Sequence, residues 1–171
     1  LLTPSKITAW LDCAHYLTLK HQVDGGGGTR SGQSFGSFAR LLMEKGLEHE
    51  QNVLASYRSA GKTILEVDDK NPTEPFADWA RRTLPSPGSA ADVIFQMPFV
   101  HERSRGVAEC LERYVDDSGG VRWDPVDAKL ARATAKPGHV LQLCFYAEAI
   151  AALNGQPAGP LKVSLGSGMD Q

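Results

Sequence analysis

Apolar residues recur at helical spacing in four stretches of the chain. At the start, Thr3 can cap a helix and Pro4 suits its first turn. One face of this helix is formed by a set of apolar residues: Ile7, Trp10, Leu11, Ala14 and Leu17. The same spacing predicts helices over residues 35–59, 76–84 and 137–153, with Gly46 interrupting the first of them. The buried side of helix 35–59 is expected to consist of Phe38, Leu41, Leu42, Val53 and Leu54.

Short apolar runs predict strands over residues 63–67, 92–100, 106–115, 121–129 and 161–165. Pro98 lacks a backbone N–H, so the second of these is expected to have an open edge or a bulge there. The turn sequence at 116–120 predicts a hairpin. The glycine-rich stretch 24–34 predicts a flexible loop. This order of elements indicates a single α/β domain of 171 residues with a mixed β-sheet flanked by helices.

The predicted hairpin brings acidic residues together. If its turn is centred on Ser118, Glu109 and Asp127 lie opposite each other, with their Cβ atoms about 5 Å apart. Lys129 projects from the same face as Asp127, because side chains alternate along a strand. Like charges in this position repel, and a bridging divalent cation would reverse that. Pro125 could shift the register by one residue. The alternative is that both acids are exposed and that Lys129 pairs with one of them.

The predicted helix 137–153 places His139, Gln142 and Tyr146 on one face. A second stripe, assigned to the core, consists of Leu141, Phe145 and Ala149. Before and within the first turn of this helix lies a compact basic patch suited to a phosphate backbone: Lys129, Arg132, Lys136 and His139. Alternatively, the basic residues form a solvated loop without a binding role, Tyr146 is an ordinary half-buried tyrosine and Gln142 is simply solvated.

Charge and cysteine content narrow the function classes. A net charge of −2 excludes wholesale coating of nucleic acid but permits a local basic groove. The apolar runs are too short to cross a membrane. The cysteines, Cys13, Cys110 and Cys144, lack close spacing and fit a reducing compartment, so we expect a cytoplasmic protein. Cys110 and Cys144 fall where small apolar core residues are expected.

Five short motifs recur in an order that resembles a known family. They are Leu2 to Ile7 with Trp10, Leu11, Cys13 and Tyr16; Lys45 to His49; Gly106 to Glu109; Asp127 to Lys129; and Gln142-Leu143 with Tyr146. Together they resemble the RecB-like branch of the PD-(D/E)XK nuclease superfamily. More narrowly, the chain looks like actinobacterial RecB-like nucleases that are fused to a helicase-type ATPase, so we expect it to be a piece of such a larger protein.

The resemblance implies a restriction-endonuclease-like core and hydrolysis of DNA phosphodiester bonds. It implies Mg²⁺ or Mn²⁺ held by His49, Glu109, Asp127 and the Ala128 carbonyl. Lys129 would activate the attacking water and stabilise charge, and Gln142 and Tyr146 would position substrate or Lys129. The implied activity is that of an exonuclease in DNA repair, acting on single strands or ends.

Two departures from the family pattern leave alternatives open. Glu109 stands where the family usually carries aspartate. Cys13 matches a cysteine that in some relatives binds an iron–sulfur cluster, but the chain stops at Gln171 without three further ligands. Cys13 is therefore either a ligand of a cluster that forms only in the full-length protein or a buried helix cysteine. The competing hypothesis is a weak or inactive nuclease-fold module that binds DNA or braces a partner domain. A small-molecule hydrolase that uses the same acids is a third.

Overall fold

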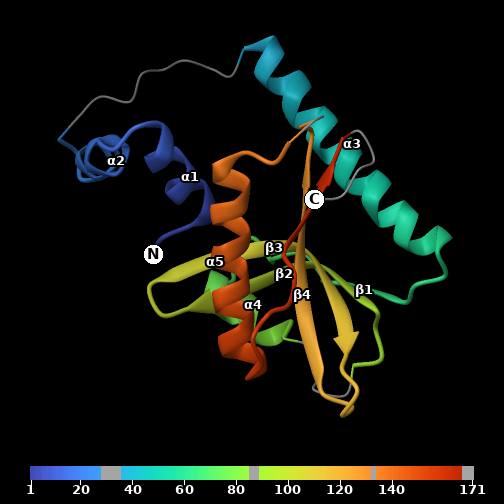
Figure 1. Ribbon diagram of the computed structural model, residues 1–171. Helices are drawn as coiled ribbons and strands as arrows, with labels where there is room; N and C mark the ends of the chain where they lie inside the picture. Colours follow the sequence, from blue (N-terminus) through green and yellow to red (C-terminus); the bar gives the residue numbers. More distant parts are fainter. Residues whose placement is uncertain (28–35, 85–88, 132–133, 167–171) are drawn as a thin grey trace.

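The computed structural model describes residues 1–27, 36–84, 89–131 and 134–166. Its centre is a five-stranded sheet in the order β1-β2-β3-β4-β5 (Figure 1). The strands are β1 (Ile64–Glu66), β2 (Val93–His101), β3 (Ser104–Val115), β4 (Val121–Lys129) and β5 (Lys162–Leu165). β2, β3 and β4 are antiparallel, whereas β1 and β5 run parallel to their neighbours. The predicted mixed sheet of an α/β domain is confirmed.

Helices cover both faces of the sheet. They are α1 (Pro4–Asp12), α2 (Tyr16–Asp24), α3 (Ser37–Ser59), α4 (Phe76–Arg82) and α5 (Pro137–Asn154). On one face Leu143 and Ile150 of α5 pack with Leu111, and on the other Leu54 of α3 packs with Cys110. α1 packs against α5, and α4 packs against β2 (Figure 1). None of the described helices is long and apolar enough to cross a membrane.

The helix boundaries differ from the sequence prediction at the N-terminus. The predicted first helix is two helices, because Cys13 adopts an extended conformation and ends α1. Nothing in the local sequence explains this break. The predicted loop 24–34 begins as the last residue of α2 and a turn, and its remainder from residue 28 lies outside the described residues.

Two helices bury other residues than expected. α3 continues through Gly46 without a break, but only Val53 and Leu54 are buried. The residues predicted to continue this buried side, Phe38, Leu41 and Leu42, are exposed, because the first half of α3 lies beyond the core. In α5 the buried residues are Leu143, Tyr146, Ala149 and Ile150. Of the predicted stripe, Ala149 is buried and Phe145 packs against the core while partly buried, but Leu141 is not among the core residues. Cys110 is buried as expected, whereas Cys144 is exposed.

The hairpin register is the one predicted from its turn. Every pair from Cys110 with Val126 to Val115 with Val121 is symmetric about Ser118. Asp116 fixes the turn, because its Oδ1 accepts hydrogen bonds from the N–H groups of Ser118 at 2.9 Å and Gly120 at 2.8 Å. The shift considered at Pro125 does not occur, since that residue pairs with Leu111.

The edge predicted at Pro98 is also present. β1 ends opposite Phe95, so no described strand pairs with the β1 side of β2 beyond that residue. Proline is tolerated there because its missing N–H breaks no ladder bond on that side.

Side chains normally alternate between the two faces of a sheet, but this alternation is interrupted at Gln96 on β2 and at Glu109 on β3. Gln96 has a φ of 60°, in the left-handed region that is costly for residues other than glycine. Phe95 packs on the α3 face, whereas Met97, two residues on, packs on the α5 face. In β3, Cys110 likewise packs on the α3 face and Ala108 on the α5 face, with Glu109 between them. The reset directs the Glu109 side chain towards the end of β4.

Gly106, the first residue of the second motif, also has a packing role. A Cβ atom at this position would meet Cζ of the Phe99 ring at 2.8 Å, which is closer than real Cβ atoms approach other atoms. Glycine therefore permits the Phe99 ring to lie flat against β3, where it supports Tyr146 at a ring-centroid distance of 5.8 Å.

Gln96 gives a test of this strained position. We expect Gln96→Val to lower the free energy of unfolding by about 2 kcal/mol relative to Gln96→Gly, because a β-branched residue is strained at positive φ. Both variants lose the amide side chain and its hydrogen bond to Glu50, so that loss cancels in their difference. Urea unfolding of the two variants measures it, and equal stabilities would contradict the assigned conformation.

Candidate active site

Three charged side chains meet where β4 ends. The Lys129 ammonium lies 2.8 Å from Asp127 Oδ1 and 3.3 Å from Glu109 Oε1. The other Glu109 oxygen, Oε2, accepts a hydrogen bond of 2.6 Å from the Ala128 N–H. Asp127 is fully buried, which excludes the alternative of two exposed acids. The register of the hairpin, continued by one residue, brings these groups together.

One oxygen of the buried Asp127 carboxylate is unsatisfied. Lys129 Nζ lies 2.8 Å from each carboxylate oxygen, but only its contact with Oδ1 has hydrogen-bond geometry. Oδ2 is buried and accepts no hydrogen bond from any residue that the structure describes. A buried carboxylate oxygen without a donor is costly, so this atom is a candidate ligand for a cation.

Burial and mutual repulsion favour protons on these acids. Burial, together with the Glu109 charge, raises the pKa of Asp127 to about 8, against the opposing effect of Lys129. Burial and Glu109 also raise the pKa of Glu50 on α3. Burial lowers the pKa of Lys129, but Glu109 and Asp127 outweigh it and the net pKa is raised, so the ammonium is charged at neutral pH. Negative charge thus exceeds what one lysine compensates.

Glu50 is the site residue that the sequence analysis missed. It lines a cleft of about 490 Å³ together with Glu109, Lys129 and Lys136. Its Oε2 accepts a hydrogen bond of 3.3 Å from Gln96 Nε2, so the strained residue of β2 holds it in place. The spacing of Glu50 from the buried Leu54 was the available signal, because residues four apart lie on the same side of a helix.

The structure places His49 apart from this group. Its Nε2 lies 3.1 Å from the Ser164 carbonyl oxygen of β5, and it lines another cavity, of about 410 Å³, with Tyr57 and Glu112. A carbonyl oxygen only accepts hydrogen bonds, so Nε2 carries the proton in this contact. Successive residues of a helix project about 100° apart, which is why the neighbour Glu50 faces the acids and His49 does not.

Gln142 and Tyr146 support Asp127. Gln142 Nε2 lies 2.5 Å from Tyr146 Oη and 3.4 Å from Asp127 Oδ1. Tyr146 is part of the core, and its burial beside Asp127 raises its pKa, so the phenol stays protonated. The predicted face of α5 is therefore at the site, and its contacts are with Asp127 instead of Lys129.

Part of the predicted basic patch also lies at the cleft. Lys136 and His139 line it, and His139 Nδ1 accepts a hydrogen bond of 3.2 Å from the Lys136 N–H. Burial, with the charges of Lys129 and Lys136, lowers the pKa of His139, so the imidazole is neutral at pH 7. Arg132 lies outside the described residues.

Of the two remaining predicted ligands, Ala128 and Cys13, only Ala128 is at the cleft. Cys13 is exposed at the end of α1, away from the acids. Throughout the described part of the chain, no three His, Cys, Asp or Glu side chains converge closely enough to hold one ion. The oxygen donors nevertheless fit the chemistry of a hard divalent cation, because Asp127 Oδ2 is unsatisfied and Glu50 and Glu109 flank the same cleft.

Comparison with known proteins adds no relative. No protein-family model matches the chain, and no curated protein resembles it in sequence. The geometry of the cleft therefore carries the functional assignment.

The buried carboxylate predicts an unusual pH dependence of stability. The folded-state pKa of Asp127 lies above the unfolded value of 3.8, so its ionisation destabilises the fold progressively between these two values as the pH rises. Asp127→Asn removes that charge. One pKa unit corresponds to about 1.4 kcal/mol, so in chelator at pH 8.5 we expect a Tm roughly 4 °C or more above wild type. At pH 5 the gain should be much smaller.

Asp116→Asn is the matched control. Hydrogen bonds from Ser118 and Gly120 lower the pKa of Asp116, so its contribution to stability is present above the unfolded value and is lost below it. This variant should be less stable than wild type at pH 8.5. Thermal unfolding followed by circular dichroism at both pH values measures both variants, and a destabilised Asp127→Asn at pH 8.5 would contradict the assigned burial.

Proposed function

We propose that the chain is a metal-dependent nuclease domain that hydrolyses DNA phosphodiester bonds. The observation that carries the proposal is the buried Asp127, whose Oδ2 lacks a donor, held against Lys129 and Glu109 beside an open cleft. Two acids and a lysine in this arrangement are typical of metal-assisted phosphodiester hydrolysis.

The charges at the cleft favour a cation as cofactor. Its lining carries the acids Glu50 and Glu109 and the lysines Lys129 and Lys136, and the buried Asp127 pairs with Lys129. A phosphodiester entering this cleft meets these acids as well as the lysines, and the acids would repel it. Mg²⁺ or Mn²⁺ bound at these oxygens would reverse that repulsion and stabilise the charge that develops on the scissile phosphate.

The side chains of the chain then divide the remaining tasks. Lys129 stays protonated and is held within reach of the same phosphate, where its ammonium can stabilise developing charge. Gln142, fixed by Tyr146, holds Asp127 Oδ1 in place. Lys136 attracts the phosphate backbone at the mouth of the cleft.

We further propose that the fold is restriction-endonuclease-like and of the RecB-like branch, fused in its full-length form to a helicase-type ATPase that acts on DNA in the cytoplasm, with repair as the setting. Support comes from the spatial order of the motifs. Glu109 on β3, Asp127 and Lys129 on β4 and Gln142 on α5 converge, although they are distant in sequence. Glu50, the residue directly after the Lys45 to His49 motif, lines the cleft in place of the expected His49.

A non-catalytic module that binds DNA or braces a partner is the second candidate. It is favoured by the ion pairs themselves, because Lys129 already pairs with both Glu109 and Asp127. Both Glu109 oxygens also have protein donors, Ala128 N–H and Lys129 Nζ. In such a module these contacts would be structural, and no divalent cation would displace them.

Cleavage assays test the first candidate. With Mn²⁺ and labelled single-stranded DNA, we expect Asp127→Ala and Lys129→Ala to lower the cleavage rate at least about 100-fold, because each removes charge stabilisation at the phosphate. Lys162→Ala is the matched control, since Lys162 pairs with Glu112 outside the cleft. Equal rates in wild type and both site variants, or no cleavage with any divalent metal, would refute catalysis at this site.

Calorimetric titration with Mn²⁺ separates the two helix residues. We expect Glu50→Gln to weaken binding by about 10–100-fold, as is usual when a partner of a metal site is lost. His49→Gln should bind as wild type does, because its Nε2 contacts Ser164 instead. The reverse ranking would assign the ligand role to His49. Absence of binding to the wild type would favour the non-catalytic module.

A further inference from the structure

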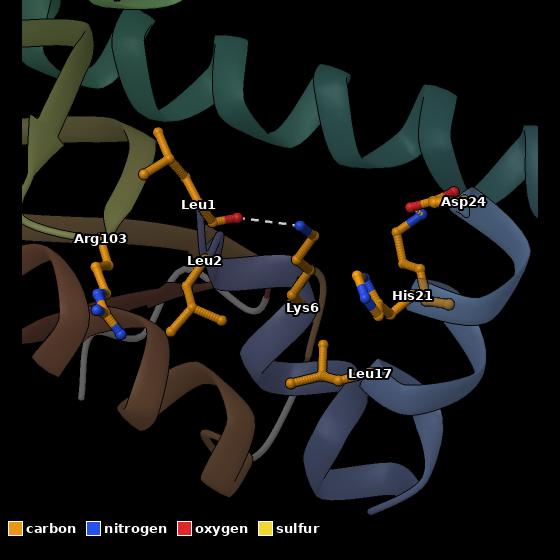
Figure 2. Close-up of a pocket in the computed structure, with 8 residues that line it drawn as sticks. Leu1, Leu2, Lys6, Leu17, His21, Asp24 and Arg103 are labelled. Atoms are coloured by element: carbon orange, nitrogen blue, oxygen red, sulfur yellow. Dashed lines mark hydrogen bonds and ion pairs between the residues drawn. The ribbon is translucent and has the colours of Figure 1, made fainter.

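A third cavity, of about 460 Å³, lies between the N-terminal residues, α1, α2 and the β2–β3 turn (Figure 2). Its polar lining is mainly basic, with Lys6 from α1, Lys20 and His21 from α2, and Arg103 from the turn. Asp24 is the only acid among its lining residues, and it pairs with Lys20 at 3.3 Å. Basic groups thus outnumber acids here, whereas the cleft is lined by two acids and two lysines.

The cavity also has an apolar wall. Leu1, Leu2 and Leu17 line it beside the basic groups. Figure 2 shows Lys6 between the Leu1–Leu2 segment and α2, where His21 and Leu17 lie, with Arg103 beyond Leu2. The Lys6 ammonium is held by the Leu1 carbonyl oxygen at 3.0 Å, a neutral partner that leaves its charge uncompensated. Arg103 contacts Leu2 through its backbone, and no acid pairs with its guanidinium in the described residues.

We infer that this cavity, hereafter the basic pocket, binds a nucleotide of a single-stranded nucleic acid, with its phosphate at Lys6 and Arg103 and its base against the leucines. Cationic groups beside an apolar wall match the two halves of an unstacked nucleotide. A duplex, whose bases are stacked inside, could offer only its phosphates. A free inorganic anion would leave the leucine wall unused.

The position of α1 links the basic pocket to the cleft. The first turn of α5, which carries Lys136 and His139 at the cleft, packs directly on α1. Gly138 permits this approach, because a Cβ atom there would already lie 3.4 Å from Thr8 Cγ2. A strand that leaves the cleft over this turn meets α1 at Thr8 and must cross the helix to reach Lys6, because residues two apart project from nearly opposite sides. The inference rests on the proposed function only in that this strand is the one that enters the cleft.

Binding measured without cleavage tests the inference. In EDTA, fluorescence anisotropy with labelled dT20 should show roughly tenfold weaker binding for the double variant Lys6→Gln, Arg103→Gln. The slope of log Kd against log salt should fall by about 0.7 for each lost phosphate contact. The control is Arg58→Gln, Arg81→Gln, which removes the same charge from exposed side chains paired with Glu66 and Asp78. It should bind as wild type does.

A single variant and a duplex DNA probe separate loss of binding from loss of folding and single-strand binding from duplex binding. Arg103→Gln alone removes an exposed side chain and covers the case in which Lys6→Gln disturbs the N-terminus; it should retain the wild-type Tm and still weaken binding. Equal affinity of the pocket and control variants for dT20 would overturn the inference, and equal weakening for duplex DNA would overturn the single-strand assignment. Because no metal is present, loss of nuclease activity in the cleavage assay would leave this result unaffected.

Discussion

The contact between the Lys129 ammonium and the buried Asp127 carboxylate governs the chemistry of this protein. Burying an ionised carboxylate costs several kcal/mol unless a partner compensates it. Lys129 supplies that partner at 2.8 Å, but it also serves Glu109 at 3.3 Å. One ammonium therefore offsets two acids, with Glu50 close by. The remaining negative charge contributes to the raised pKa values of Glu50 and Asp127, and Asp127 Oδ2 is left without a hydrogen-bond donor among the described residues. The same imbalance would attract a divalent cation.

Two irregular positions of the sheet, Gln96 and Glu109, lie beside this contact. Gln96 holds a left-handed conformation in the middle of β2 and donates to Glu50. Opposite it, β3 changes face at Glu109, whose side chain then reaches the Ala128 N–H at the end of β4. Strained residues of this kind persist when surrounding structure determines them, and they concentrate at functional sites. Here the strained Gln96 holds Glu50 of α3 by a hydrogen bond, and Glu109 of β3 pairs with Lys129 in the same cleft.

The cleft and the basic pocket differ in their lining. The cleft brings the acids Glu50 and Glu109 beside Lys129 and Lys136 and would suit a cation-dependent reaction, whereas the pocket carries mainly basic groups beside leucines and would suit a nucleotide held without chemistry. α1 packs on α5 between them. Under the proposed function, this division would separate attraction of the strand from its cleavage, because acids that hold a metal repel the substrate until that metal is bound.

The sequence by itself determined the five strands, the three later helices and the hairpin register, but not the division of the first helix into α1 and α2. Asp116 and the glycines after Ser118 fix a tight turn, and alternation along β4 places Asp127 and Lys129 together, whereas Glu109 reaches them where the alternation of β3 changes. Tertiary packing alone decided which side of α3 faces the acids, because burial of Val53 and Leu54 sets the rotation of that helix and so selects Glu50 over His49. Packing also gathered Lys6 and Arg103, nearly a hundred residues apart, since no local pattern encodes contacts between distant segments.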